Sequence, residues 1–158
     1  MQLILKSPVR FTKNLSHYEN ILSHLVKVGN YFIPVLSESV ILEEYSKKLH
    51  LFAERYECWY VSELVGLLAI YNNKKDHAVA YVTNVSVDKL FGGQGIASEL
   101  LYRCILDATE MKTWRIDLHV NKFNMRAIAM YGKYGFKLVD KIEDKLLMSL
   151  ILDKYANK

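Results

Sequence analysis

The sequence has little that would make a metal centre, a disulfide scaffold or a membrane span. Its two cysteines, Cys58 and Cys104, lie far apart, and no Cys-x-x-Cys or clustered histidine pattern occurs, so we expect neither a metal nor a disulfide. No apolar run reaches the roughly 18 residues of a membrane helix, and the apolar core of Met1–Pro8 is too short for a signal peptide. The sequence therefore predicts a cytoplasmic protein without a membrane partner.

The excess of positive over negative charge is also small. The net charge is +4, and no lysine run is longer than the pairs at 47–48 and 74–75. This excess suits a small anionic ligand, but the absence of a basic stripe predicts no nucleic-acid partner. The 158 residues, of which 51% are hydrophobic, contain no linker or repeat, so we expect one domain over 1–158.

A glycine-rich turn between a predicted strand and a predicted helix is the most informative stretch that the sequence does have. The strand pattern of Val85–Asp88 leads into Gly92–Gly95, which holds three glycines in four positions, and apolar spacing from Ile96 predicts a helix over 95–110. Glycines ahead of a helix leave backbone N–H groups accessible at the positive end of the helix dipole. This arrangement predicts an anion site, most naturally for phosphate.

Two common glycine loops do not fit this segment. A P-loop requires Lys-Ser or Lys-Thr after the glycines, and a dinucleotide fingerprint starting at Gly93 would need glycine at Ser98. The segment instead resembles the acetyl-CoA-binding loop of the GNAT acetyltransferase superfamily, Arg/Gln-x-x-Gly-x-Gly/Ala. Gly95 and Ala97 fill its last two named positions, and Gly92 stands where the family has Arg or Gln.

A second motif strengthens the resemblance. The later GNAT motif, Asn-x-x-Ala-x-x-x-Tyr-x-x-x-Gly-Phe, is matched at the right spacing by Asn124, Ala127, Tyr131, Gly135 and Phe136. It follows the glycine loop by about one helix and one strand, as it does in the family. The two motifs together identify the chain as similar to GNAT acetyltransferases.

The resemblance covers residues 58–150 well and the first 57 loosely. It implies an α/β (α+β) fold with a single mixed, mostly antiparallel sheet and helices on both faces. It implies an acetyl-CoA-dependent N-acetyltransferase, with acetyl-CoA as cosubstrate and direct transfer to a primary amine. The residues that it implies for cofactor binding are Val85, Val87, Gly92, Gly93, Gln94, Gly95, Ile96, Ala97, Ser98, Asn124, Tyr131 and Lys133.

Two catalytic residues are expected. Tyr131 matches the family tyrosine and, with an unperturbed pKa of about 10, can give a proton to the leaving sulfur; the alternative is a core tyrosine. His119 projects from the predicted strand opposite Leu118 and Val120, so it is a candidate general base. Deprotonation through water, with no single base, is the competing interpretation.

The acceptor site is less defined by the sequence. The family usually builds it from the N-terminal helices and the last hairpin, and we expect Tyr31, Phe32, Thr83 and Asn84 to contribute, although Tyr31 and Phe32 fit a core seal equally well. A small-molecule amine is the expected acceptor, in a monomer or homodimer. The alternatives are N-acetylation of a protein or peptide amine, a CoA-binding sensor or scaffold without turnover, and a structural domain without CoA.

The order of the predicted elements is two helices, a three-stranded meander, a helix, a strand, a helix and a hairpin, with one short strand ahead of them. Asn14 or Ser16 is expected to cap the first helix and Asn124 the last. The predicted helices are 16–28, 40–56, 95–110 and 124–134, and the predicted strands are 3–5, 58–61, 64–71, 78–87, 114–120, 137–142 and 146–152.

Overall fold

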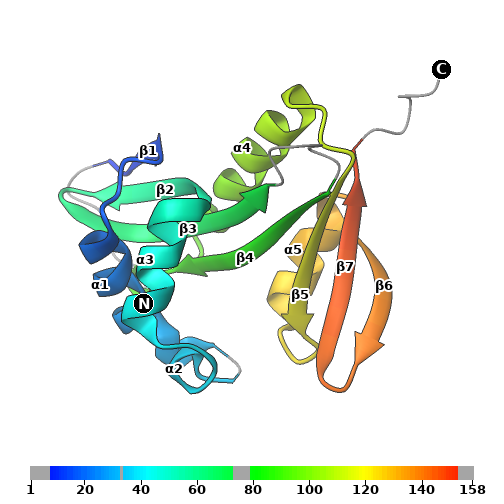
Figure 1. Ribbon diagram of the computed structural model, residues 1–158, viewed down its shortest axis with the longest axis horizontal. Coiled ribbons are helices and arrows are strands. Elements are labelled where there is room, and N and C mark those ends of the chain that lie inside the picture. Colours follow the sequence, from blue (N-terminus) through cyan, green and yellow to red (C-terminus); the bar gives the residue numbers. More distant parts are fainter. Residues whose placement is uncertain (1–7, 33, 73–78, 153–158) are drawn as a thin grey trace. The chain divides into compact units, whose positions relative to one another are not determined.

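The computed structural model describes residues 8–32, 34–72 and 79–152 (Figure 1). The chain forms two compact units. The first consists of Met1–Ala69 and Asn84–Leu101, and the second of Ile70–Thr83 and Tyr102–Lys158. The predicted strand at 3–5 lies outside the described residues.

The described strands belong to one seven-stranded sheet in the order β1-β2-β3-β4-β5-β7-β6. β4 and β5 pair in parallel, whereas β1 with β2, β5 with β7 and β6 with β7 pair antiparallel. This mixed, mostly antiparallel sheet confirms the predicted fold class. In chain order the elements are β1 (Arg10–Lys13), α1 (Tyr18–Val28), η1 (Gly29–Tyr31), α2 (Leu36–Ser39), α3 (Leu42–Phe52), β2 (Glu54–Tyr60), β3 (Glu63–Asn72), β4 (Val79–Val87), η2 (Lys89–Phe91), α4 (Ile96–Glu110), β5 (Arg115–Asn121), α5 (Met125–Lys133), β6 (Lys137–Ile142) and β7 (Lys145–Ile151).

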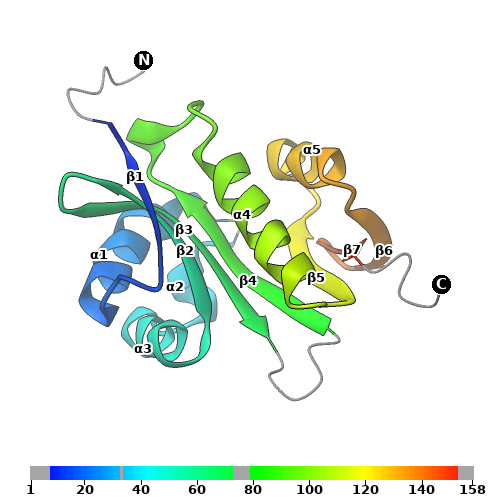
Figure 2. The same cartoon turned by 90° about the horizontal axis from the view of Figure 1, so that it is seen from above.

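The central strands of the first unit form its core. β3 is buried from Leu64 to Ile70, as its apolar run predicts. A Cβ atom at Gly66 would lie 2.8 Å from Ile96 Cγ2, so only glycine lets the start of α4 approach the sheet this closely. Figure 2 shows α1 and α3 on the other side of β2 and β3 from α4.

A buried ion pair on β2 holds the segment before α1 in place. Arg55 and Glu57 are 4% and 0% exposed, with Arg55 Nε 3.5 Å from Glu57 Oε2. Glu57 accepts hydrogen bonds from Thr12 Oγ1, from the backbone N–H groups of Leu15 and Ser16, and from Ser16 Oγ. Arg55 donates to the carbonyls of Leu49, His50, Ala53 and Ser16. β2 begins four residues before its predicted start. The prediction missed these residues because Arg55 and Glu57 are charged and do not fit the apolar pattern of a buried strand.

The N-terminal cap of α1 differs from the prediction. His17 is the N-cap, and Asn20 Oδ1 accepts from the His17 N–H in a reciprocal capping arrangement. Ser16 is instead bound to Glu57, and Asn14 donates to Glu54. The expected caps are therefore wrong because both side chains tie the preceding loop to β2.

His24 on α1 is a buried, neutral histidine in the first unit. It is 1% exposed; Nδ1 lies 3.2 Å from the Leu64 carbonyl oxygen, to which it donates, and Nε2 lies 2.8 Å from Ser86 Oγ. Burial lowers the pKa of His24 from 6.5 to about 4, and hydrogen bonding to Leu64 opposes this only in part. The folded state therefore binds a proton at His24 less readily than the unfolded state does.

This difference predicts acid lability. The contribution of neutral His24 to stability is fully present above pH 6.5, falls as the pH drops below that value, and is lost near pH 4. The loss corresponds to roughly 3 kcal/mol of unfolding free energy, at 1.36 kcal/mol per pKa unit. Urea unfolding of the wild type and His24→Asn between pH 7 and pH 4.5 measures it. The variant should lose less stability than the wild type over this range; parallel pH dependences would contradict the assignment.

The second unit packs α5 and the second half of α4 on one face of its strands. Ile116, Leu118 and Val120 of β5 are buried, whereas Arg115, Asp117 and His119 alternate with them, as predicted. Asn124 caps α5 by accepting from the Ala127 N–H at 3.2 Å, which confirms the predicted cap. β5 therefore presents an apolar face to the helices and a polar face on its other side.

Candidate active site

The glycine loop of the first unit is held by two short backbone devices. Asp88 accepts from the Leu90 N–H at 3.0 Å, and the Gly92 N–H donates to the Lys89 carbonyl at 3.1 Å, which together close η2. The Glu99 N–H then donates to the Gly95 carbonyl at 3.0 Å and starts α4. Because the first N–H groups of a helix have no intrahelical acceptor, those of Ile96 and Ala97 remain available to a ligand.

Gly95 meets the requirement for a pyrophosphate cradle. Its φ is +78°, which favours glycine, and a Cβ atom placed there would meet no other atom within 4 Å. The space beside the backbone at the head of α4 is therefore open. Gly93 has a φ of +75°, so the loop turns twice through conformations that side-chain-bearing residues rarely adopt. These residues fit the phosphates of acetyl-CoA.

Replacing Gly95 by valine is expected to weaken acetyl-CoA binding by about tenfold or more, equivalent to 1.4 kcal/mol. A branched side chain would fill the open space and strain the positive φ. The measurement is the melting-temperature shift on adding acetyl-CoA, compared with the shift for Gly132→Ala, where the new methyl also meets nothing within 4 Å. Equal shifts for both variants would remove the loop from the cofactor site.

The remaining candidates of the first unit lie on β4 and around η1. Val85 and Val87 are half-buried and alternate with the buried Asn84 and Ser86. Asn84 Oδ1 accepts from Ser86 Oγ at 2.8 Å, whereas its amide nitrogen is buried and lacks a partner among the described residues. An unpartnered buried donor is costly, so Asn84 remains a ligand-binding candidate.

The aromatic candidates of this unit are more exposed than a core seal would be. Tyr31 is 56% exposed, and its ring packs against the Lys89 ammonium at 5.5 Å. Phe32 is half-buried. Tyr31 therefore contacts η2, which directly precedes the glycine loop, through Lys89.

The second unit contains the predicted acid. Tyr131 is 6% exposed and packs against Phe136, with ring centroids 5.7 Å apart. Burial raises the pKa of Tyr131 to about 12, so the hydroxyl is protonated at neutral pH and has a proton to give. Lys133 is exposed in the last turn of α5, and Thr83 is half-buried on β4.

The structure gives His119 a partner that the sequence did not indicate. Tyr81 Oη lies 2.7 Å from His119 Nδ1, and the two rings are 5.6 Å apart. Burial raises the pKa of Tyr81, and the negative charge of Asp117 raises it further, so the hydroxyl stays neutral. When Nδ1–H donates to this oxygen, the lone pair of the exposed His119 is at Nε2, where it can accept a proton.

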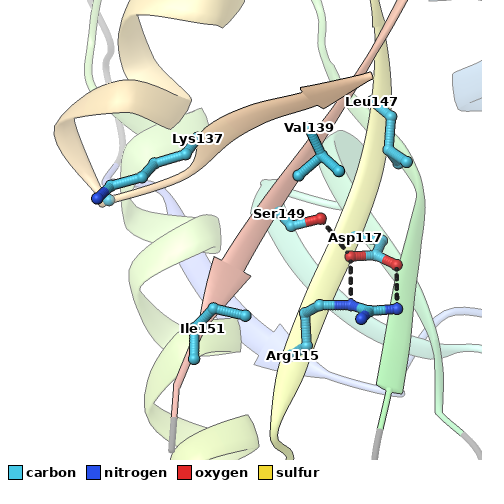
Figure 3. Close-up of a pocket in the computed structure, with 8 residues that line it drawn as sticks. Arg115, Asp117, Lys137, Val139, Leu147, Ser149 and Ile151 are labelled. Atoms are coloured by element: carbon cyan, nitrogen blue, oxygen red, sulfur yellow. Dashed lines mark hydrogen bonds and ion pairs between the residues drawn. The ribbon is translucent and has the colours of Figure 1, made fainter. Parts of the chain in front are cut away.

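A pocket of about 410 Å³ lies on the same face of β5 (Figure 3). Asp117 is fixed in it: Arg115 Nε and Nη2 donate to its two oxygens at 2.9 and 3.1 Å, and Ser149 Oγ donates at 2.6 Å. The residues that line it are Arg115, Asp117, Gly135, Lys137, Val139, Leu147, Ser149 and Ile151.

Sequence reasoning missed Tyr81 and this pocket for the same reason. Tyr81 is one of eleven tyrosines, and its importance arises from the parallel register of β4 and β5, which pairs Tyr81 with Asp117. The pocket requires three strands in register. Neither register follows from the local pattern of a single strand.

The described residues also bear on two other kinds of site, a metal centre and a membrane-spanning helix. No group of three or more His, Cys, Asp or Glu side chains among these residues is placed to hold a metal ion, and both cysteines are buried and form no disulfide. No helix in these parts of the chain has the length and apolar character to cross a membrane.

Comparisons with known proteins agree with these features. Residues 27–136 match the Acetyltransferase (GNAT) family, and the chain belongs to this family. The N-alpha-acetyltransferase MAK3 of Arabidopsis thaliana is 29% identical over 120 residues, which cover 68% of this chain and 62% of that protein's length.

Solved structures show the same fold. The ribosomal-protein-S18-alanine N-acetyltransferase of Escherichia coli aligns with a TM-score of 0.74 and 14% identity, covering 92% of this chain and 94% of that one. The PaiA N-acetyltransferase of Thermoplasma acidophilum, solved in complex with coenzyme A, aligns with a TM-score of 0.71 and 13% identity, covering 92% and 99%. At these identities the likeness establishes the fold.

Proposed function

We propose that this protein acetylates the free α-amine of a protein or peptide, with acetyl-CoA as the donor and the Tyr81–His119 pair as the proton acceptor. The 2.7 Å contact between Tyr81 Oη and His119 Nδ1 is the observation that carries the proposal. The contact would hold His119 as a base on the exposed face of β5, and it therefore supports His119 over the alternative of deprotonation through water.

The roles of the residues follow from their protonation states. The backbone N–H groups of Ile96 and Ala97, beside Gly95, bind the pyrophosphate. Acetyl-CoA supplies the acetyl group as a thioester. His119 Nε2 takes the proton of the attacking amine as the new carbon–nitrogen bond forms, and the Tyr131 hydroxyl gives its proton to the departing sulfur as the carbon–sulfur bond breaks. Exchange with water returns both side chains to their starting states.

The lower pKa of an α-amine favours it as the acceptor over a lysine side chain. An unperturbed α-amino group has a pKa of about 7.7–8.0, against about 10.4 for a lysine side chain. A histidine can deprotonate the first near neutral pH, whereas the second would require a site that strongly lowers the amine's pKa. The similarity to an N-alpha-acetyltransferase supports the same acceptor. The small-molecule amine that the sequence led us to expect remains the alternative.

Replacing Tyr131 by phenylalanine is expected to lower kcat by roughly 10²-fold, at the lower end of general-acid effects. The hydroxyl makes no hydrogen bond to the described residues, so its removal should leave folding and acetyl-CoA affinity nearly unchanged. Steady-state CoA release compares the variant with Tyr102→Phe, which removes an exposed hydroxyl from α4. Equal kcat values for the two variants would exclude Tyr131 as the acid.

An acceptor panel tests the proposed function. CoA release is measured with short peptides that have a free N-terminus, the same peptides with a blocked N-terminus, free amino acids and polyamines. We expect kcat/KM to be highest for the peptides with a free N-terminus, and we expect activity to be lost when the N-terminus is blocked. A preference for amino acids or polyamines would establish the small-molecule alternative.

A further inference from the structure

We infer that the pocket between β5, β6 and β7 is a specificity subsite for an apolar, uncharged side chain at one of the first two residues of the acceptor. The inference rests on the proposed function and specifies which side chains the peptide acceptor carries near its N-terminus. Its basis is the position of the pocket beside the Tyr81–His119 pair, the chemistry of its lining, and an irregularity in β6.

The register places the pocket next to the proposed base. Leu147, a lining residue, is the cross-strand partner of His119, and Asp117, another lining residue, is the partner of Tyr81. Directly opposed residues have Cβ atoms about 4.5–5.5 Å apart. A side chain one or two residues from an amine held at His119 therefore reaches the pocket.

The Arg115, Asp117 and Ser149 side chains of the pocket bond to one another. Arg115 and Asp117 neutralise each other through two hydrogen bonds, and Ser149 donates its only hydrogen to the same carboxylate. Figure 3 shows the Lys137 side chain extending away from this cluster. A polar side chain would therefore gain little here, because the polar groups that it could bond are already engaged with one another.

The apolar part of the lining comes from Val139, Leu147 and Ile151. β6 pairs Leu138 with Met148 and Asp140 with Leu147, so Val139 is an extra residue opposite Leu147. Such a bulge redirects a side chain relative to a regular strand. Val139 is 61% exposed on an edge strand. The bulge brings this apolar side chain to the pocket, where a bound apolar side chain would cover it.

The test compares two peptides that differ only in one of their first two side chains, leucine against serine. We expect the wild type to prefer the leucine peptide by about 10–200-fold in kcat/KM, the range typical of hydrophobic pockets. Val139→Trp should fill the pocket and abolish the preference by slowing the leucine peptide alone. Ile142→Trp is the control, because Ile142 is equally exposed on β6 but does not line the pocket.

A second variant, Val139→Ala, distinguishes a change in the pocket from a general disturbance of β6 by the large tryptophan side chain. Val139→Ala enlarges the pocket, so it should shift the preference from leucine toward phenylalanine. Equal rates for the two peptides in the wild type, or the same loss in the Val139→Trp and Ile142→Trp variants, would overturn the subsite while leaving peptide acetylation intact. Failure to acetylate any peptide would overturn the proposed function and the subsite with it.

Discussion

The His119→Gln variant is expected to lose about 10²–10⁴-fold in kcat, the range that a positioned general base contributes. Glutamine keeps a polar group near Nε2 but cannot accept a proton there. The glycine loop belongs to the other unit and keeps its backbone geometry, so acetyl-CoA affinity should not change. Single-turnover acetyl transfer at saturating peptide measures the effect.

The matched control is His50→Gln, which removes a histidine side chain from the last turn of α3 in the first unit. It should leave kcat unchanged. A His119→Gln variant that retains the wild-type rate would show that water alone deprotonates the amine.

Tyr81→Phe refines this result, because it removes the hydroxyl and keeps the ring beside His119. If the hydroxyl acts by setting the histidine tautomer, its loss should cost about tenfold alone and nothing further in the His119→Gln background. Such non-additivity is the mark of two residues that act as one unit. Independent, additive losses would separate Tyr81 from the base.

The second large effect is on stability. Arg55→Leu leaves the fully buried Glu57 carboxylate without its cation, and breaking a buried ion pair in this way costs about 3–5 kcal/mol. That is a large part of the roughly 5–15 kcal/mol that stabilises a typical domain. The urea midpoint should therefore fall sharply, and the release of Thr12 and Ser16 should loosen the segment before α1.

Two further variants keep this prediction testable if Arg55→Leu does not fold. Arg55→Lys retains the charge but not the planar fork that reaches several carbonyls, so an intermediate loss is expected. Lys27→Ala breaks the exposed pair between Lys27 and Glu63, at 2.9 Å, and should cost no more than about 1 kcal/mol. Equal losses from the buried and the exposed pair would contradict the structural role of Arg55.

The sequence predicted those features that depend on local pattern. The helix over 95–110, the cap at Asn124 and the final hairpin each carry their signal within a few residues, and the structure confirms them. β1 was not predicted, because its four residues pair with β2 across more than forty positions of sequence. Tyr81 gains its role in the same non-local way, through strand pairing.

Sequence patterns gave wrong predictions mainly where polar side chains are buried. Glu57 and Arg55 look like surface residues in the sequence, yet each satisfies the other and a set of backbone groups inside the first unit. Ser16 was expected to cap a helix and is instead part of that network. Single-residue propensities cannot foresee a buried network whose members come from separate elements.

The proposed function is tested by the position of the acetyl group on a peptide that has a free N-terminus, an apolar second residue and an internal lysine. The peptide is incubated with the protein and acetyl-CoA, and the modified residue is located by tandem mass spectrometry. The proposed function predicts a single acetyl group on the α-amine, and this product should be lost with His119→Gln. An acetyl group on the lysine, or an unmodified peptide in the presence of an active small-amine substrate, would contradict it.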